Sequence, residues 1–252
     1  MNISWIDHRT VRYVACCALT WLTVSAALAQ NNDQPKDAVR GRFDGEIADF
    51  EKWDRQNAWP REPVLFVGSS SIRLWETAEA FPELPVINRG FGGSTIRDAN
   101  HYFDRIVTKY QPRAIVFYSG DNDIAGGMKA QQVYDDFLAF MELVRGRVGK
   151  TPVYFISIKP SIARQKMWPE MKKANSLVQS LAGIDGQVIY VDVATHMLGT
   201  RLAGRQGIPS KKLFLADGLH LNADGYELWN KTLTPLLASA DDPEQSPPGG
   251  DR

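Results

Sequence analysis

The stretch PVLFVGSSSIRLW, residues 63–75, runs through bulky apolar side chains to Gly68 and continues with three consecutive serines. A short apolar run without charged residues is typical of a strand that is buried on both faces of a parallel sheet. The residues after Gly68 are small and polar, so we expect the strand to turn there into the start of a helix. The stretch therefore predicts one strand–turn–helix unit of an α/β protein, with serines at the carboxyl end of the strand.

Four further apolar runs follow along the chain. They are LPVIN (84–88), RAIVFYSG (113–120), TPVYFISI (151–158) and QVIYVDV (187–193). Segments with apolar positions three and four residues apart alternate with these runs and predict helices. The predicted helices span 95–109, 130–148, 169–183 and 222–238. This alternation predicts an α/β domain whose five-stranded, mostly parallel sheet is covered by helices on both faces.

The domain organisation follows from changes in composition along the chain. We expect a signal peptide over 1–29, a lead and a packing helix over 30–60, one folded domain over 61–238 and a disordered tail over 239–252. The tail, rich in Pro, Gly and charged residues, has too few apolar residues to form a core. No repeat and no second domain are predicted.

The N-terminal segment has the pattern of a secretory signal. Arg9 and Arg12 precede the apolar stretch 13–28, and an Ala-x-Ala pattern stands before Gln30. An uncleaved membrane anchor is the alternative, but the stretch is shorter than the roughly 20 residues that a spanning helix needs. We therefore expect export to the periplasm or the medium, with no stable membrane insertion after cleavage.

Composition excludes several classes of function. The chain has 252 residues, 44% of them hydrophobic, with 29 basic and 29 acidic side chains. This balance gives no long-range field that would recruit nucleic acid. Both cysteines, Cys16 and Cys17, lie in the predicted signal, so the mature chain has no disulfide, cysteine nucleophile or zinc–cysteine site.

Loops at the carboxyl ends of the strands are where ligands bind in such sheets. Four of these loops carry glycine or small polar residues: GSSS (68–71), NRGFGGST (88–95), GDND (120–123) and LFLADGLHLNADGY (213–226). The loop after the fourth strand, SIKPSIARQKMW (157–168), is less distinctive. We expect a single site where the four loops meet.

Nucleophilic chemistry at a serine requires a base and a group that orients the base. Asp217 and His220, three residues apart on the last loop, form a candidate pair. His101 lies within a predicted amphipathic helix beside Tyr102, and His196 lies in a connecting segment that has no acid placed in this way. A surface or core role is the commoner outcome for any single histidine.

A tetrahedral intermediate also requires hydrogen-bond donors for its oxyanion. The backbone N–H of Gly93, the Asn122 amide and the N–H of the serine itself are candidates. The alternative interpretations are a flexible turn for the glycines and a helix cap for residues 121–123.

Four blocks, VGSSSIRLW, INRGFGGSTI, YSGDND and DGLHLN, occur in this order. Over about residues 63–238 the chain resembles the SGNH hydrolases, also called the GDSL lipase/acylhydrolase family, including the branch with the platelet-activating-factor acetylhydrolase catalytic subunits. The resemblance implies the flavodoxin-like, three-layer α/β/α fold of these hydrolases. It makes 61–238 the hydrolase domain.

The family motifs can be carried over by position. The second serine of GSSS, Ser70, is then the expected nucleophile, with Asp217 and His220 as its catalytic partners. Gly93 and Asn122 would form the oxyanion hole with the Ser70 N–H.

Two positions depart from the family pattern. Ser69 stands where the family has aspartate, and Ser71 where the family's shorthand name has leucine. Neither position is the nucleophile or a base, so we expect activity to survive, with altered hydrogen bonding around Ser70. The chain also lacks the Gly-x-Ser-x-Gly elbow of α/β-hydrolases.

The predicted function is that of an exported serine esterase acting on carboxylic esters, without a metal or organic cofactor. Its substrate is expected to be a small-molecule or glycan ester with a short acyl group, on a carbohydrate or a lysophospholipid; this preference is by analogy alone. The alternatives are a catalytically silent glycan- or cell-wall-binding module and a metal-dependent phosphoesterase using GDND and His220. Side chains near the loops would either shape a pocket or serve as packing and solvated cations, namely Arg73, Trp75, Arg89, Lys159 and Trp168.

Overall fold

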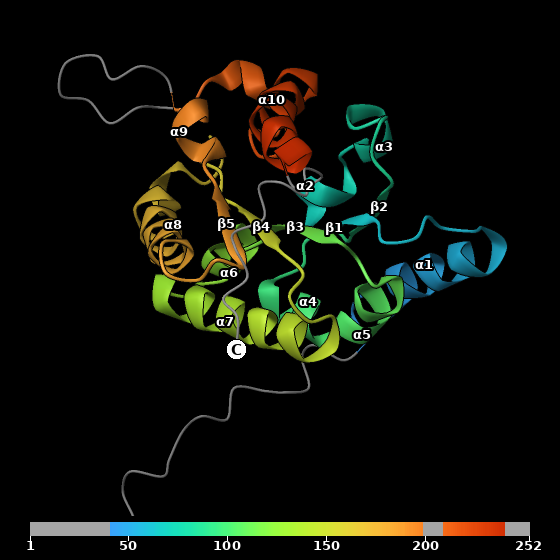
Figure 1. Cartoon of the computed structure of the whole chain (residues 1–252). Helices are drawn as coiled ribbons and strands as arrows, with labels where there is room; N and C mark the ends of the chain where they lie inside the picture. The colour runs from blue at the N-terminus through green and yellow to red at the C-terminus, as the bar shows by residue number, and fades with distance from the viewer. Residues whose placement is uncertain (1–40, 199–208, 240–252) are drawn as a thin grey trace, which may run out of the picture. The chain divides into compact units, whose positions relative to one another are not determined.

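The computed structural model describes residues 41–198 and 209–239 (Figure 1). Its strands form one sheet in the order β2-β1-β3-β4-β5, and each pair of neighbours is parallel. The strands are β1 (Val64–Gly68), β2 (Val86–Gly90), β3 (Ala114–Tyr118), β4 (Val153–Ile156) and β5 (Val188–Val191). The five-stranded parallel sheet is therefore confirmed, in the strand order of flavodoxin-like folds.

Helices cover both faces of this sheet (Figure 1). On one face lie α4 (Ile96–His101), α5 (Phe103–Ile106), α7 (Ala130–Arg147) and α8 (Trp168–Ala182), with α1 (Asp44–Gln56) beside α5. On the other face lie α2 (Ser70–Arg73), α3 (Thr77–Ala80), α9 (Val193–Met197) and α10 (Ala223–Ser239). The short α6 (Asp121–Ala125) follows β3, and single 3-10 turns occupy Thr108–Tyr110, Gln165–Met167 and Lys211–Leu213. The three-layer α/β/α architecture is confirmed.

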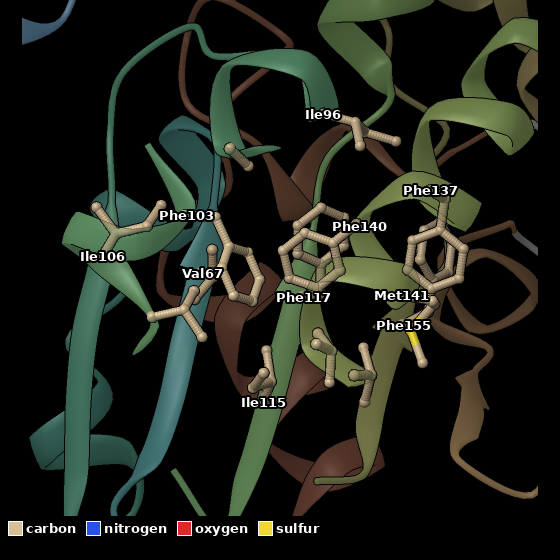
Figure 2. Close-up of a cluster of buried hydrophobic side chains, with 14 of the residues drawn as sticks. Val67, Ile96, Phe103, Ile106, Ile115, Phe117, Phe137, Phe140, Met141 and Phe155 are labelled. Atoms are coloured by element: carbon tan, nitrogen blue, oxygen red, sulfur yellow. The ribbon is translucent and has the colours of Figure 1, made fainter. Parts of the chain in front are cut away.

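The central strands bury both of their faces, which explains their continuous apolar runs. Along β3, Ile115 and Phe117 belong to one hydrophobic cluster, whereas Val116 and Tyr118 belong to the other. Alternating side chains of a strand point to opposite faces, so a strand covered on both sides has no polar position. Figure 2 shows the first cluster, in which strand side chains meet phenylalanines of α5 and α7.

The segment 95–109 differs from the single helix that its periodicity predicts. The structure has two short helices and a 3-10 turn, with a break at Tyr102 (φ −93°, ψ 8°). The buried Tyr102 ring packs edge-on against Phe91, and its hydroxyl donates to Asp44 at 2.9 Å. These tertiary contacts override the local preference for one continuous helix, and the break directs Phe103 and Ile106 into the core.

The packing helix expected within residues 30–60 is α1, and Arg89 at the end of β2 is one of its contacts with the sheet. The Arg89 side chain is buried, its guanidinium lies over the rings of Phe50, Trp53 and Tyr110, and it pairs with Asp54 at 2.6 Å. Arg89 is therefore neither a solvated cation nor exposed to a pocket.

Several predictions concern parts of the chain outside the described residues. They are the signal peptide over 1–29, the first part of the lead, and the tail from residue 240. Among the helices of residues 41–198 and 209–239, none is long and apolar enough to cross a membrane.

Candidate active site

The serine loop leaves the sheet at Gly68, where the backbone has a conformation that requires glycine. Its φ is +140°, and a Cβ at this position would lie 1.8 Å from the carbonyl oxygen of Tyr118 on β3. The next residue, Ser69, donates its backbone N–H to the same carbonyl at 3.0 Å. Ser70 is then the first residue of α2. The chain therefore turns within two residues and presents Ser70 at the carboxyl edge of the sheet.

The structure brings Ser70, His220 and Asp217 together. Ser70 Oγ lies 3.1 Å from His220 Nε2, and His220 Nδ1 lies 2.6 Å from Asp217 Oδ2. Ser70 and His220 are 150 residues apart in sequence. In this arrangement Nδ1–H can donate to the carboxylate, which leaves Nε2 free to accept the serine proton.

The loop that carries Asp217 and His220 is held by its own backbone. Leu215 N–H donates to His220 O at 2.8 Å, and Gly218 N–H donates to Leu215 O at 2.9 Å. Gly218 has a φ of +63°, which favours glycine. Asp217 Oδ1 accepts from the backbone N–H groups of Leu219 and His220, at 2.8 and 3.0 Å. The sequence DGLH (217–220) thus forms the turn and places Asp217 in contact with His220.

The Asp217 carboxylate is strongly favoured over its acid form. The hydrogen bond from the Leu219 N–H, followed by those from the His220 side chain and N–H, lowers the pKa of Asp217 to about 2. The side chain is 46% exposed, so the hydrogen bonds and not burial cause the shift. Asp217 is therefore ionised throughout the neutral range.

The second loop brings Gly93 to the same edge of the sheet. Gly93 has a φ of +72°. The following residue, Ser94, ties the loop to β1 because its hydroxyl lies 3.3 Å from Gly68 O and 3.0 Å from Phe91 O. Among the described residues, no hydrogen bond occupies the N–H of Gly93 or of Ser70. Both N–H groups are available to a ligand.

Asn122 is the second residue of α6, after β3, and contacts the second loop. Its Nδ2 donates to Ser94 O at 2.9 Å, and its Oδ1 accepts from Arg164 Nη2 at 2.8 Å. The neighbouring Asp123 accepts from the Ile96 N–H at 3.0 Å. The three sequence-predicted oxyanion donors therefore belong to loops that are linked to one another through hydrogen bonds.

Sequence reasoning missed Arg164 and the buried contacts of Lys159, both in the loop after β4. Lys159 is only 1% exposed and donates to Ser71 Oγ (3.0 Å), Tyr118 Oη (2.9 Å) and Asp121 Oδ2 (3.2 Å). Arg164 Nη1 lies 2.9 Å from the same Asp121 oxygen. The alternative of a solvated cation is wrong for Lys159. The one available signal was a lysine and a proline shortly after β4, and it does not predict a partner.

Burial and ion pairing act on these groups in opposite directions. Burial lowers the pKa of Lys159, while the Asp121 charge opposes that shift. Burial alone would raise the pKa of Asp121, but Lys159 and Arg164 together hold it below its usual value. We conclude that Lys159 and Asp121 form an ion pair.

The two departures from the family pattern have different surroundings. Ser69 Oγ is buried and has no hydrogen-bond partner in the described part of the chain. Ser71 Oγ accepts from Lys159, and the Ser71 carbonyl accepts from the Tyr226 hydroxyl at 2.9 Å. The Ser69 side chain therefore contributes packing and no hydrogen bond among the described residues, whereas Ser71 links α2 to the buried Lys159.

Other candidates near the loops are structural. Trp75 is buried against Tyr226 and Trp229 and donates its Nε1–H to Asn230. Trp168 packs partly buried against the first cluster. The described residues contain no group of three or more His, Cys, Asp or Glu side chains placed to hold a metal ion. Asp121 is already paired with two cations, which argues against GDND as a metal-binding motif.

Comparison with known families identifies the chain. The sequence model of the family described as GDSL-like lipase/acylhydrolase matches residues 73–228, more than half of the chain. The chain belongs to this family. As a GDSL-like lipase/acylhydrolase it is an SGNH-type esterase, and the resemblance noted from the motifs is confirmed. The match includes Gly93, Asn122, Asp217 and His220 and begins three residues after Ser70.

Solved structures of similar fold include other members of this group. A Streptococcus pneumonia protein with the provisional description platelet activating factor has 23% identity and a TM-score of 0.66, over 77% of this chain and 92% of its own. A GDSL-like lipase from Bacteroides thetaiotaomicron has 19% identity and a TM-score of 0.64, over 77% of this chain and 98% of its own. A lipase/acylhydrolase from Enterococcus faecalis has 19% identity and a TM-score of 0.58, over 73% and 100%. At these sequence identities, the structural similarity shows only that this GDSL-like enzyme shares its fold with the three proteins. The comparison with curated proteins finds no match.

Proposed function

We propose that this esterase is exported and that it hydrolyses short-chain carboxylic esters through Ser70, His220 and Asp217. The observation that carries the proposal is the continuous contact from Ser70 Oγ through the His220 ring to the Asp217 carboxylate, at 3.1 and 2.6 Å. An ionised acid, a base in contact with a serine, and free N–H groups beside it are the groups that acyl transfer requires.

In acylation, His220 Nε2 takes the Ser70 proton while Ser70 Oγ attacks the carbonyl carbon of the ester. The carbonyl electron pair moves to the oxygen, which becomes an oxyanion facing the Ser70 N–H, the Gly93 N–H and the Asn122 amide. Asp217 stabilises the imidazolium that forms. The intermediate collapses, the bond to the alcohol breaks, and the alcohol oxygen takes the proton from His220.

Deacylation repeats these steps with water as the nucleophile. His220 removes a proton from water, and the resulting hydroxide attacks the acyl carbon. When the second intermediate collapses, the bond to Ser70 breaks and Ser70 Oγ regains its proton from His220. The carboxylic acid leaves, and the enzyme returns to its starting state without a cofactor.

We further propose a substrate with a short acyl group, attached to a carbohydrate or a lysophospholipid. Export would bring the enzyme to glycan and lipid esters outside the cytoplasm, and the description of the pneumococcal structural neighbour names platelet activating factor. The two substrate classes can be separated by comparing hydrolysis of acetylated sugars with that of lysophospholipids. Hydrolysis of neither panel would refute the substrate proposal and leave the mechanism unaffected.

The export proposal can be tested on the protein recovered outside the cytoplasm. Cleavage after residue 29 predicts a mature chain that begins at Gln30, and intact-mass spectrometry measures this directly. Recovery of the full-length chain in the membrane fraction would instead support the uncleaved anchor.

Labelling with a fluorophosphonate tests the nucleophile. We expect the wild-type enzyme to form a covalent adduct and to hydrolyse p-nitrophenyl acetate, and we expect Ser70→Ala to do neither. Ser176→Ala, which changes an exposed serine of α8, is the matched control and should behave as wild type. Equal labelling of wild type and Ser70→Ala would refute Ser70 as the nucleophile, and no turnover by the wild type would favour the silent binding module.

A further inference from the structure

The Asn122 side chain is held in one orientation by two contacts of opposite chemistry. The carbonyl oxygen of Ser94 can only accept, so it requires the Nδ2 side of the amide, at 2.9 Å. The Arg164 guanidinium can only donate, so it requires the Oδ1 side, at 2.8 Å. Nδ2 carries two hydrogens. One is donated to Ser94 O, and the other can be donated to a ligand. A rotated amide would lose both contacts and turn its oxygen towards Ser94 O.

Arg164 is itself fixed by an ion pair. Its Nη1 lies 2.9 Å from Asp121 Oδ2, and its Nη2 reaches Asn122. The planar guanidinium thus spans two adjacent residues of α6, Asp121 and Asn122. The side chain is 17% exposed, so solvent competes little for these contacts. A single point charge such as a lysine ammonium cannot reproduce this fork.

Lys159 continues the network from Asp121 to the nucleophile's helix. An ammonium group has three hydrogens, and Lys159 directs them to Asp121 Oδ2, Tyr118 Oη and Ser71 Oγ. Because Ser71 is next to Ser70, the network connects Arg164, which contacts Asn122, to the turn that carries the proposed nucleophile. Its members are buried or mostly buried, so their geometry is set by the protein rather than by water.

The network also carries a net positive charge. It contains two cations, Lys159 and Arg164, and one carboxylate, Asp121, whose two ion pairs both use Oδ2. In a region of low dielectric, this positive charge stabilises an anion that forms nearby. The oxyanion expected beside Asn122 is such an anion.

We propose that Arg164 is a positioning residue that holds the Asn122 amide with its free N–H towards the oxyanion, and that the Lys159–Asp121 pair fixes Arg164. The inference rests on the proposed function for the identity of the bound anion. The orientation of Asn122 itself does not depend on the chemistry.

A double-mutant cycle on p-nitrophenyl acetate hydrolysis tests the proposal. Arg164→Met should lower kcat roughly 10- to 100-fold with little change in KM, because a displaced donor is lost mainly in the transition state. In an Asn122→Ala background the same change should alter kcat by less than about threefold, since residues that act as a unit are not additive. Arg164→Lys should give an intermediate kcat. Equal effects of Arg164→Met in the two backgrounds would overturn the proposal.

A second measurement separates this proposal from the proposed function. In the ¹⁵N-labelled enzyme, the Asn122 side-chain amide signals can be assigned from their disappearance in Asn122→Ala. We expect Arg164→Met to shift or broaden these signals, and Arg145→Met, which removes an exposed ion pair with Asp185, to leave them unchanged. Unchanged Asn122 signals in folded Arg164→Met would overturn the proposal. Displaced signals in an enzyme that forms no Ser70 adduct would support the positioning role and refute the proposed chemistry.

Discussion

The two sides of the site are built in different ways. The acid–base side, Leu215–His220, holds Asp217 and His220 through hydrogen bonds within one six-residue loop, and the Asp217 side chain is 46% exposed. The side that carries the proposed oxyanion donors joins segments that follow four strands, β1, β2, β3 and β4, through Asn122 and the Lys159–Asp121–Arg164 network, in which Lys159 is 1% exposed. A local, hydrated motif can be replaced with little effect on folding. In a buried, long-range network, we expect a single substitution to affect stability and the proposed chemistry together.

The largest expected effect is on the exposed side. His220→Ala should lower kcat on p-nitrophenyl acetate by at least about 10⁴-fold, because Ser70 loses its base. The melting temperature should stay close to that of wild type, since the loop is held by backbone contacts. His196→Ala, an exposed histidine of α9, is the control and should retain activity. A large drop in melting temperature for His220→Ala would contradict the comparison.

Two aspartates allow a direct contrast in stability. Asp121→Asn leaves Lys159 and Arg164 without a counter-charge and should lower the free energy of unfolding by about 3–5 kcal/mol. Asp217→Asn removes an exposed charge and should change that free energy by less than about 1 kcal/mol, although activity falls. Urea titration at neutral pH measures both variants. Similar losses for the two would show that burial does not distinguish the two sides.

Asp123, on the buried side, should make stability depend on pH. Burial is the main cause that raises the pKa of Asp123 to about 7, and its Oδ2 has no partner in the described chain. Between pH 4 and 7 the folded state keeps a proton that the unfolded state releases, so stability falls as pH rises towards 7 and levels off above it. The free energy of unfolding of Asp123→Asn, relative to wild type, should therefore increase by about 2 kcal/mol between pH 5 and 7. A difference that is constant with pH would refute this.

The smallest expected effect is at Ser69. Since its buried hydroxyl has no partner among the described residues, Ser69→Ala should change the free energy of unfolding by less than about 1 kcal/mol and leave kcat unchanged. Thermal unfolding and p-nitrophenyl acetate hydrolysis measure both quantities. A clear loss of activity would indicate that the serine in the family's aspartate position supports Ser70 after all.

Sequence reasoning recovers the features that depend on neighbouring residues. The apolar runs predict all five strands. The runs of β1, β3 and β4 are continuous because both faces of these strands are buried. Asp217 and His220 stand out because they lie three residues apart on one loop. The break at Tyr102 was not predicted, since it depends on contacts with Asp44 and Phe91, which are distant in sequence. Arg164 and the contacts of Lys159 were missed for the same reason, because their partners follow other strands. The signal peptide and the first part of the lead, within residues 1–40, remain predictions.

The burial of Lys159 has a consequence for chemical labelling. Its ammonium group is enclosed by Ser71, Tyr118 and Asp121, so an amine-reactive reagent cannot reach it in the folded enzyme, while exposed lysines such as Lys172 and Lys173 react. Modification at Lys159 therefore requires this part of the fold to open. The rate at which Lys159 becomes modified would report how often its buried contacts with Ser71, Tyr118 and Asp121 open.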